Sequence, residues 1–312
     1  MKKIFLLLCV LVISGIYSQA MPRRDAAGPL RFGIVPAVDS LPLMLAEQRG
    51  YFAQEGADVE LVFFPNPHER EMAIQAGQLD GAVSDLLTAA FLIQAGFDFR
   101  ATSLTNGRFG IVASPESGIA SLHDLRGRNI GLFPNTMTQY MADNLLLSAG
   151  IPITEYTPVA VPNILLRLEM VLDGRIDAAV LPEPVLTAAV AQGGVLVATT
   201  DGTGLDSAIL FFSRRSLDTR LEEVKAFHRA YYRAAMAINA NPDAFRDFLV
   251  DQAGFPPAVR NAFQFVTYTQ PTLPTEQHIR HTLDWLTYRD LLQRQLSPQD
   301  FYDARAITEW SN

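Results

Sequence analysis

Short apolar runs alternate with segments of helical spacing along most of this chain. The apolar runs predict β-strands at 30–36, 59–64, 79–83, 129–133, 159–161 and 176–181. Apolar residues recur with helical spacing between these runs, at 41–52, 69–76, 85–95, 136–149 and 164–172. Because strands that alternate with helices through short loops form parallel sheets covered by helices, the pattern predicts an α/β fold with mainly parallel sheets.

The pattern changes after the apolar segment Ala208–Phe212. The last hundred or so residues are mostly helical in character, and the clearest amphipathic segments are Leu221–Asn239 and Asp284–Gln295. We therefore expect a helical C-terminal part that packs against the α/β core.

An internal repeat joins the two halves of the α/β region. The stretch Ala76–Val83 (AGQLDGAV) matches Asp173–Val180 (DGRIDAAV), and the residues Leu-Thr-Ala-Ala follow in both, at 87–90 and 186–189. The spacing of about a hundred residues is much longer than the 20–50 residues of solenoid repeats, so the repeat favours two related α/β domains. The shared Gly-x-x-Asp can also be explained as a helix stop followed by a strand start.

The N-terminus has the features of a secretion signal. Lys2 and Lys3 precede the apolar run Ile4–Ile13, and Ser18-Gln-Ala20 offers a small-residue cleavage site. The pattern predicts a signal peptide over residues 1–20, cut after Ala20, and hence a periplasmic or other extracytoplasmic location. The run is too short to cross a bilayer, which needs about 20 residues. The alternatives are a retained N-terminal anchor or lipidation at Cys9.

Composition narrows the classes of partner and chemistry. The 33 acidic residues outnumber the 25 basic ones, so we expect no nucleic acid partner, because no basic stripe is present to displace counterions. Cys9 is the single cysteine and lies in the predicted leader. The cleaved chain would therefore have no disulfide, thiolate nucleophile or cysteine metal site.

The chain resembles periplasmic substrate-binding proteins of the nitrate, sulfonate and thiamine-precursor family of ABC importers. The residues that carry the resemblance are LMLAEQRGYF at 43–52 with Gly56, Gly77-x-x-Asp80, LHDLRGRNIG at 122–131, Gly174-x-x-Asp177, Glu183-Pro184 and Asn241-Pro242. The resemblance implies a type II two-lobe binding fold, with two crossing strands between the lobes and a ligand in the cleft. It also implies an ABC permease and ATPase as partners, a monomer, and no membrane insertion after cleavage.

The resemblance further implies how the chain divides. Lobe I would comprise residues 30–112, lobe II residues 113–207, and the mostly helical 208–312 would complete lobe I. The two crossings are expected near Ile111–Ser114 and Ala208–Phe212.

Ligands of open α/β sheets bind beyond the carboxyl ends of the strands, where loops enter helix N-termini. This rule selects loop residues from both lobes as candidate ligand contacts: Asp39, Ser40, Phe64, Asn66, Ser84, Asp85, Asn106, Asn135, Thr136, Asn163 and Glu183. Several have a structural alternative. Ser84, Asp85, Asn135 and Thr136 could serve only as helix caps, Phe64 could belong to the core, and Glu183 could act at a hinge or lie on the surface.

The charges of these loops bear on the ligand. Asp39, Asp85 and Glu183 are carboxylates, and Arg108 is the only obvious base nearby. Charge-assisted hydrogen bonds from carboxylates suit a neutral or cationic nitrogen heterocycle, such as a thiamine-precursor pyrimidine or a related vitamin. The alternative is a sulfonate or nitrate-type anion held by backbone N–H groups after Pro134.

Enzyme motifs do not occur in the sequence. There is no Gly-x-Ser-x-Gly, phosphate loop or Gly-x-Gly-x-x-Gly, and His278 and His281 have no obvious third metal ligand. The same superfamily contains pyrimidine-synthesising enzymes with a cysteine-rich motif and an active-site lysine. Outside the predicted leader this chain has no cysteine, and its single lysine there, Lys225, lies on a predicted helix. We therefore expect a binding protein without cofactor or metal. The alternatives are a ligand sensor for a receptor and a pyrimidine-synthase-like enzyme.

Overall fold

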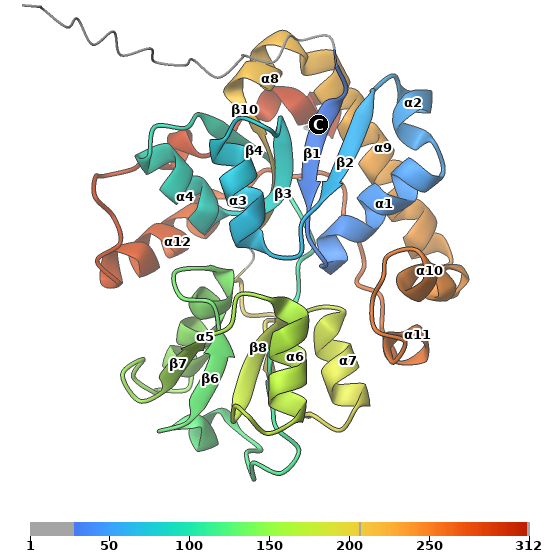
Figure 1. Cartoon of the computed structure of the whole chain (residues 1–312). Helices are drawn as coiled ribbons and strands as arrows, with labels where there is room; N and C mark the ends of the chain where they lie inside the picture. Colours follow the sequence, from blue (N-terminus) through green and yellow to red (C-terminus); the bar gives the residue numbers. More distant parts are fainter. Residues whose placement is uncertain (1–27, 206, 311–312) are drawn as a thin grey trace, which may run out of the picture.

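The computed structural model describes residues 28–205 and 207–310, so the predicted signal peptide lies outside the described residues. Figure 1 shows two lobes, each built on one sheet with helices against its faces. The first sheet has the order β2 (Val59–Phe63), β1 (Leu30–Ile34), β3 (Gly81–Asp85), β10 (Ala208–Ser213), β4 (Phe99–Leu104). The second has the order β7 (Thr157–Ala160), β6 (Asn129–Leu132), β8 (Ala178–Pro182), β5 (Phe109–Ala113), β9 (Val195–Thr199).

Each sheet contains a strand that runs against its neighbours. In lobe I this strand is β10, which is antiparallel to β3 and β4, and in lobe II it is β5, which is antiparallel to β8 and β9. The remaining pairings, β2–β1–β3 and β7–β6–β8, are parallel. The predicted α/β class with two lobes and mainly parallel sheets is therefore confirmed.

The chain passes between the lobes between β4 and β5 and again between β9 and β10. The expected first crossing at Ile111–Ser114 is wrong, because Phe109–Ala113 is already paired within the second sheet. The first crossing is the segment 105–108. A Cβ on Gly107 would lie 2.9 Å from the Cβ of Ala208 and 3.1 Å from Oδ2 of Asp39, so the first crossing passes too close to the start of β10 and to Asp39 for a side chain there. The second crossing likewise ends where β10 begins, instead of lying within Ala208–Phe212.

The helices follow the predicted order. Those of the first half of lobe I are α1 (Leu41–Gln48), α2 (Tyr51–Glu55), α3 (Pro67–Gln75) and α4 (Leu86–Gln94). Lobe II contains α5 (Met137–Ser148), α6 (Ile164–Leu172) and α7 (Val185–Ala191). After β10 come α8 (Arg214–Thr219), α9 (Leu221–Ala240), α10 (Arg246–Asp251), α11 (Val259–Ala262) and α12 (Glu276–Tyr288). Short 3₁₀ turns lie at Val38–Ser40, Leu122–Leu125, Pro242–Phe245, Pro298–Asp300 and Ala304–Trp310.

Two helix predictions need correction. The expected single helix over 41–52 is divided between α1 and α2, because Gly50 adopts a left-handed conformation with φ 67°. The helix expected at Asp284–Gln295 is α12, which begins eight residues earlier, at Glu276, and ends seven residues earlier, at Tyr288. The Thr275 hydroxyl accepts from His278 N and starts α12, and Asp290, with φ 57°, lies just beyond its end.

The Gly-x-x-Asp repeat has the same structural role in both lobes. Asp80 Oδ2 accepts a hydrogen bond from Arg31 N at 2.9 Å, and Asp177 Oδ2 accepts from Asn129 N at 2.8 Å. Each aspartate thus ties the residues that directly precede its own strand, β3 or β8, to the start of the neighbouring parallel strand, β1 or β6. The repeat in the sequence corresponds to one strand–helix unit that occurs in each lobe.

The C-terminal helices α9 and α12 pack on lobe I, as predicted, whereas α11 contacts α7 of lobe II. Helix α9 lies against α1 and α2, and α12 lies against α4. The rings of Phe32, Phe212 and Phe227 form a cluster between the sheet and α9, with centroids 4.5 to 5.1 Å apart. Within residues 28–205 and 207–310, no helix combines the length and apolar character that a membrane span requires.

Candidate functional site

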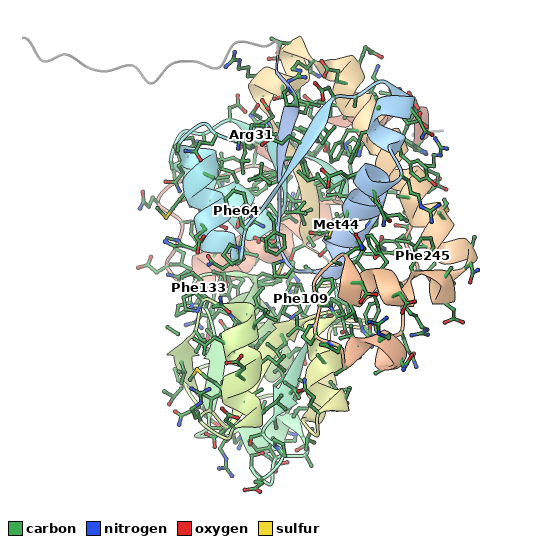
Figure 2. All side chains as sticks on the ribbon, turned by 45° about the vertical axis from the view of Figure 1, so that its right-hand side comes forward. Arg31, Met44, Phe64, Phe109, Phe133 and Phe245 are labelled. Carbon is green, nitrogen blue, oxygen red and sulfur yellow. The ribbon has the colours of Figure 1, made fainter. Side chains whose placement is uncertain are left out.

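A cavity of about 70 Å³ lies between the two lobes. Its polar wall contains Asp39, Arg70, Glu71, Ser84 and Asp85 from lobe I and Thr136, Thr138 and Arg167 from lobe II. Phe109, Phe133 and Met137 contribute apolar surface, and Figure 2 shows Phe109 and Phe133 at the boundary between the lobes. The walls follow the carboxyl ends of β1, β3, β6 and β8, which is where ligands bind in open α/β sheets.

Asp39 is a buried carboxyl in this wall. It lies in the 3₁₀ turn after β1, only 4% exposed, and among the described residues it forms no ion pair. Burial raises the pKa of Asp39 to about 6, although the Thr105 side chain opposes the change. Both carboxylate oxygens of Asp39 lie 3.1 to 3.2 Å from where a Cβ on Gly107 would stand, so Asp39 lies beside the first crossing as well as in the cavity wall.

A second acidic group forms where α3 meets the start of α4. Arg70 donates to Val83 O at 2.6 Å, to Glu71 Oε1 at 3.1 Å and to Ser84 Oγ at 3.2 Å. Asp85 caps α4 by accepting from Thr88 N at 2.8 Å. Burial raises the pKa of both Glu71 and Asp85, and the nearby Arg70 guanidinium counteracts part of this effect.

Lobe II faces this group with a buried guanidinium. Arg167 is 1% exposed and donates to Val161 O at 2.6 and 3.0 Å and to Val180 O at 2.8 Å. Arg167 forms no ion pair with a carboxylate of the described residues. Burial lowers the pKa of its guanidinium to about 10. Beside it, Thr136 donates to Phe133 O at 2.6 Å, and its hydroxyl lies 3.0 Å from that of Thr138.

The cavity brings together four of the residues that the sequence selected, namely Asp39, Ser84, Asp85 and Thr136. The other seven do not line it. Ser40 donates to Val35 O, Asn66 and Asn163 cap α3 and α6, and Asn106 pairs with Thr269. Phe64 packs at the border of the apolar core, and the Asn135 backbone N–H donates to the Gln139 side chain.

Glu183 has a place of its own at the junction of the lobes. It is 2% exposed and does not line the cavity, and its carboxylate accepts from Thr187 N and Thr187 Oγ1, each at 3.0 Å. Its backbone joins the lobes, because Val38 N donates to Glu183 O at 2.9 Å. The hinge position that the sequence left open for this residue matches these contacts.

Arg70 and Arg167 are wall residues that sequence reasoning missed. Arg108, the base that the sequence did single out, is paired with Asp201 at 2.6 Å at the edge of the hinge. A signal was present: in each half of the repeat, an arginine follows the capping asparagine by four residues, after Asn66 and after Asn163. In both lobes the arginine at this spacing lines the cavity.

Three of the five histidines have side-chain hydrogen-bond partners. His278 forms a capping box with Thr275, and His281 Nδ1 lies 3.1 Å from Tyr140 Oη. His228 is buried against Thr102, and burial lowers its pKa to about 3. Among the described ranges, no group of three or more His, Cys, Asp or Glu is arranged to hold a metal ion.

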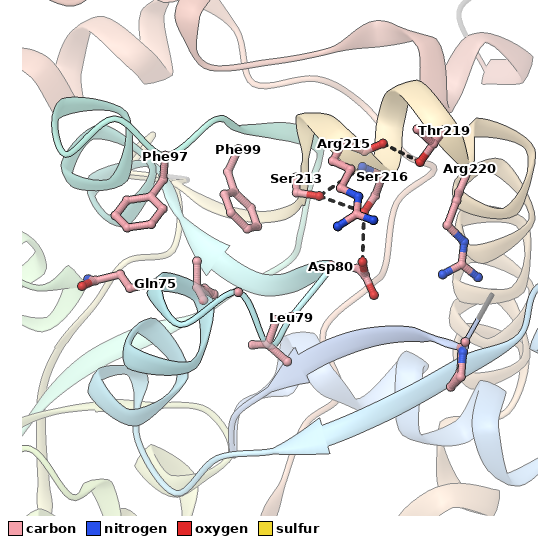
Figure 3. A pocket seen from close by; sticks show the side chains of 14 residues that line it. Gln75, Leu79, Asp80, Phe97, Phe99, Ser213, Arg215, Ser216, Thr219 and Arg220 are labelled. Carbon is pink, nitrogen blue, oxygen red and sulfur yellow. Dashed lines mark hydrogen bonds between the residues drawn. The ribbon is translucent and has the colours of Figure 1, made fainter. Parts of the chain in front are cut away.

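A larger cavity, of about 210 Å³, lies at the opposite end of the lobe I sheet (Figure 3). Its wall includes Phe97, Phe99 and Asp80, and Figure 3 shows the hydrogen bond from Ser216 Oγ to Asp80 Oδ1. Every residue in this wall belongs to lobe I, so movement of one lobe against the other would not open or close it. The interlobe cavity is therefore the stronger candidate for a ligand site.

Comparison with known proteins places these features in context. A family model described as "NMT1/THI5 like" matches residues 37–245. A curated relative, the 4-amino-5-hydroxymethyl-2-methylpyrimidine phosphate synthase of Schizosaccharomyces pombe, is 26% identical over 121 residues, which are 38% of this chain and 35% of the relative. The match thus spans about a third of that relative's length.

Solved structures share the fold over most of the chain. The alkanesulfonate-binding protein SsuA of Xanthomonas axonopodis pv. citri, bound to MOPS, superposes with a TM-score of 0.76 at 21% identity, over 89% of this chain and 99% of that one. The ligand-binding component of an ABC-type import system of Staphylococcus aureus, with zinc bound, gives 0.76 at 16% identity, over 89% and 97%. These likenesses show a two-lobe binding-protein fold.

Proposed function

Because the chain belongs to the NMT1/THI5-like family, we propose that it is the extracytoplasmic solute-binding component of an ABC importer. The observation that carries this proposal is the interlobe cavity, whose wall is shared between β3–α4 of lobe I and β6–α5 of lobe II. A solute held there contacts both lobes at once, so it binds the closed arrangement more tightly than the open one. By that difference in affinity it shifts the population toward the closed form.

We propose a small nitrogen heterocycle as the ligand, such as a thiamine-precursor pyrimidine or a related vitamin. Three carboxyls, Asp39, Glu71 and Asp85, lie in the wall, and burial raises the pKa of each. A ligand that donates N–H groups to such carboxyls gains charge-assisted hydrogen bonds in a site closed to water. The aromatic side chains of Phe109 and Phe133 offer apolar contact to a flat ring.

A second ligand class, a sulfonate or similar anion, is favoured by one observation. Arg167 lies in the wall as a buried cation whose hydrogen-bond partners among the described residues are all backbone carbonyls. A sulfonate would give the Arg167 guanidinium a negatively charged partner, which it does not have among the described residues. Against this, its donors already serve Val161 and Val180, whereas an acceptor-rich carboxylate such as Asp85 keeps lone pairs for a donor from the ligand.

The proposal is binding without turnover. Lys225, the one lysine outside the predicted leader, lies on α9 and pairs with Glu222 at 2.9 Å, away from the cavity. No described residue therefore brings an amine to the cavity wall for covalent chemistry. As an exported binding component, the chain would pass its ligand to a membrane permease driven by an ATPase. The sensor alternative would use the same cleft with a receptor as its partner.

A thermal-shift screen tests this proposal. The protein is heated with 4-amino-5-hydroxymethyl-2-methylpyrimidine, with thiamine, and with the alkanesulfonates taurine and MOPS. A ligand at about 100 times its dissociation constant stabilises the native state by about 2.7 kcal/mol, which raises the unfolding temperature measurably. Stabilisation by the pyrimidine and its unchanged concentration after incubation support the proposal. Loss of the pyrimidine with formation of a product would support the enzyme alternative.

A further inference from the structure

A buried polar cluster joins lobe II to the C-terminal helix of lobe I, away from the ligand cavity. At its centre is Asp143 on α5, which is 0% exposed. One carboxylate oxygen, Oδ1, accepts from Tyr156 Oη at 2.7 Å, within lobe II. The other, Oδ2, accepts from Trp285 Nε1 on α12 at 2.8 Å and pairs at 2.6 Å with Nη2 of Arg289, the residue that directly follows α12.

Helix α12 is attached to lobe I by its other contacts. It packs on α4, and the segment that follows it is tied to the end of α4 by Gln293 N to Gln94 Oε1 at 2.6 Å and Arg294 Nη2 to Ile93 O at 2.8 Å. Figure 1 shows α12 at the lower edge of the upper lobe, on the side of α5. The Asp143 contacts therefore cross from one lobe to the other.

Aromatic packing surrounds the same junction. The rings of Tyr140 and Trp285 meet edge to face with centroids 5.5 Å apart, and Tyr140 Oη lies 3.1 Å from His281 Nδ1. The Asp143 carboxylate is fully buried while the Arg289 side chain is 24% exposed, so removal of Arg289 would leave the Asp143 charge buried without its cation.

The position of α5 matters because its first turn is part of the ligand wall. Thr136, Met137 and Thr138 line the cavity at the start of this helix, and Asp143 is one to two turns further along it. Whatever fixes α5 against lobe I also fixes this wall against Asp39 and Asp85.

We propose that Asp143 is a positioning residue that, through Trp285 and Arg289, holds the lobes in the closed arrangement without touching the ligand. We call the contacts of Asp143 with Trp285 and Arg289 the interlobe joint. The free energy of this joint sets the fraction of ligand-free protein that is closed, and that fraction in turn sets the ligand affinity. Only the consequence for affinity rests on the proposed function. The joint itself is a property of the empty protein.

Distance measurement by electron spin resonance tests the joint directly. Spin labels are placed on exposed positions of the helices that face each other across the cavity, with the substitutions Met72→Cys on α3 and Leu165→Cys on α6, in the full chain carrying Cys9→Ser. The matched variants are Arg289→Gln, which breaks the interlobe pair, and Arg294→Gln, which breaks a contact within lobe I only. Trp285→Phe keeps the packing but removes the indole donor.

We expect Arg289→Gln and Trp285→Phe to increase the open-to-closed ratio of the ligand-free protein about tenfold, seen as growth of a longer interlobe distance. Arg289→Lys, which keeps the cation, should restore part of the closed population, and Arg294→Gln should leave the distribution unchanged. The proposal is overturned if Arg289→Gln and Trp285→Phe give the wild-type distribution, or if Arg294→Gln shifts it equally. Because the measurement needs no ligand, its outcome is independent of whether a pyrimidine binds.

Discussion

Arg70 and Arg167 occupy equivalent positions in the two lobes. Each donates from Nη1 to the carbonyl of a valine thirteen residues further along the chain, Val83 at 2.6 Å and Val180 at 2.8 Å. Each side chain also passes a strand glycine, since a Cβ on Gly33 would lie 3.2 Å from Arg70 Cγ and one on Gly131 would lie 3.3 Å from Arg167 Cγ. The repeated unit therefore includes a buried arginine that ties a helix to the strand at the cleft edge.

These arginines should be sensitive to conservative change. Lysine keeps the charge but carries its three donors on one nitrogen. It cannot occupy the separate positions from which the guanidinium nitrogens of Arg167 reach Val161 and Val180, or those from which Arg70 reaches Val83, Ser84 and Glu71. We expect each change to lower the free energy of unfolding by about 1–3 kcal/mol, measured by urea denaturation. Arg280→Lys, on an exposed pair with Glu276, is the control and should change it by less than about 0.5 kcal/mol. Equal midpoints for all three variants would contradict this view.

Asn163 distinguishes a helix cap from a ligand contact. Its side chain accepts from Leu166 N at 2.9 Å at the start of α6, outside the cavity wall. Asn163→Ala should therefore cost about 1 kcal/mol of stability and leave ligand affinity unchanged. Asn66→Ala, at the equivalent cap of α3, should behave in the same way. A tenfold loss of affinity at unchanged stability would instead place Asn163 in the ligand site, as the sequence suggested.

The buried carboxyl of Asp39 should make stability depend on pH. Its folded pKa of about 6 exceeds the ordinary value of 3.8, so between those values the native state holds a proton that the unfolded chain has lost. Native stability then falls as pH rises from about 4 to about 6, by up to about 3 kcal/mol, and levels off above that range. Asp39→Asn cannot ionise, so its stability relative to wild type should improve across this interval in denaturation measurements at several pH values. A difference that is constant with pH would show that Asp39 does not titrate in this way.

Most of the fold could be predicted from the sequence, because its signals are local. Apolar runs, Gly-x-x-Asp turns and the internal repeat depend on neighbours in the chain, and they gave the strand–helix order and the two lobes. The crossing at Gly107 could not be located this way. The run Phe109–Ala113 looks the same whether it joins the first sheet or the second, and only long-range pairing with β8 and β9 decides.

The site was predicted less completely, for a related reason. The strand-end rule selected loops, and it found Asp39, Ser84, Asp85 and Thr136 in the wall. It overlooked Arg70 and Arg167, which lie a turn inside their helices and reach back toward the strands. The ligand charge inferred from loop residues therefore included the carboxylates but left out the guanidinium groups of Arg70 and Arg167, which line the same cavity.

Asp85 is the carboxyl on which ligand recognition should depend most. Asp85→Asn keeps an oxygen to cap α4 through Thr88 N, so the fold is preserved while the negative charge is lost. We expect affinity for a pyrimidine amine to fall by about 10- to 100-fold, as for loss of a hydrogen bond to a charged group, measured by calorimetry. Asp124→Asn, at an exposed turn of lobe II, is the charge-matched control. Equal affinity of both variants would remove Asp85 from the recognition site.

The central claim is that this chain binds a nitrogen heterocycle between its lobes, and isothermal titration calorimetry of the purified protein tests it most directly. The account predicts saturable, one-to-one binding of 4-amino-5-hydroxymethyl-2-methylpyrimidine with a negative heat-capacity change, as expected when the lobes close over apolar surface. It also predicts that taurine and MOPS bind far more weakly. Tight binding of an alkanesulfonate together with no heat from the pyrimidine would contradict it.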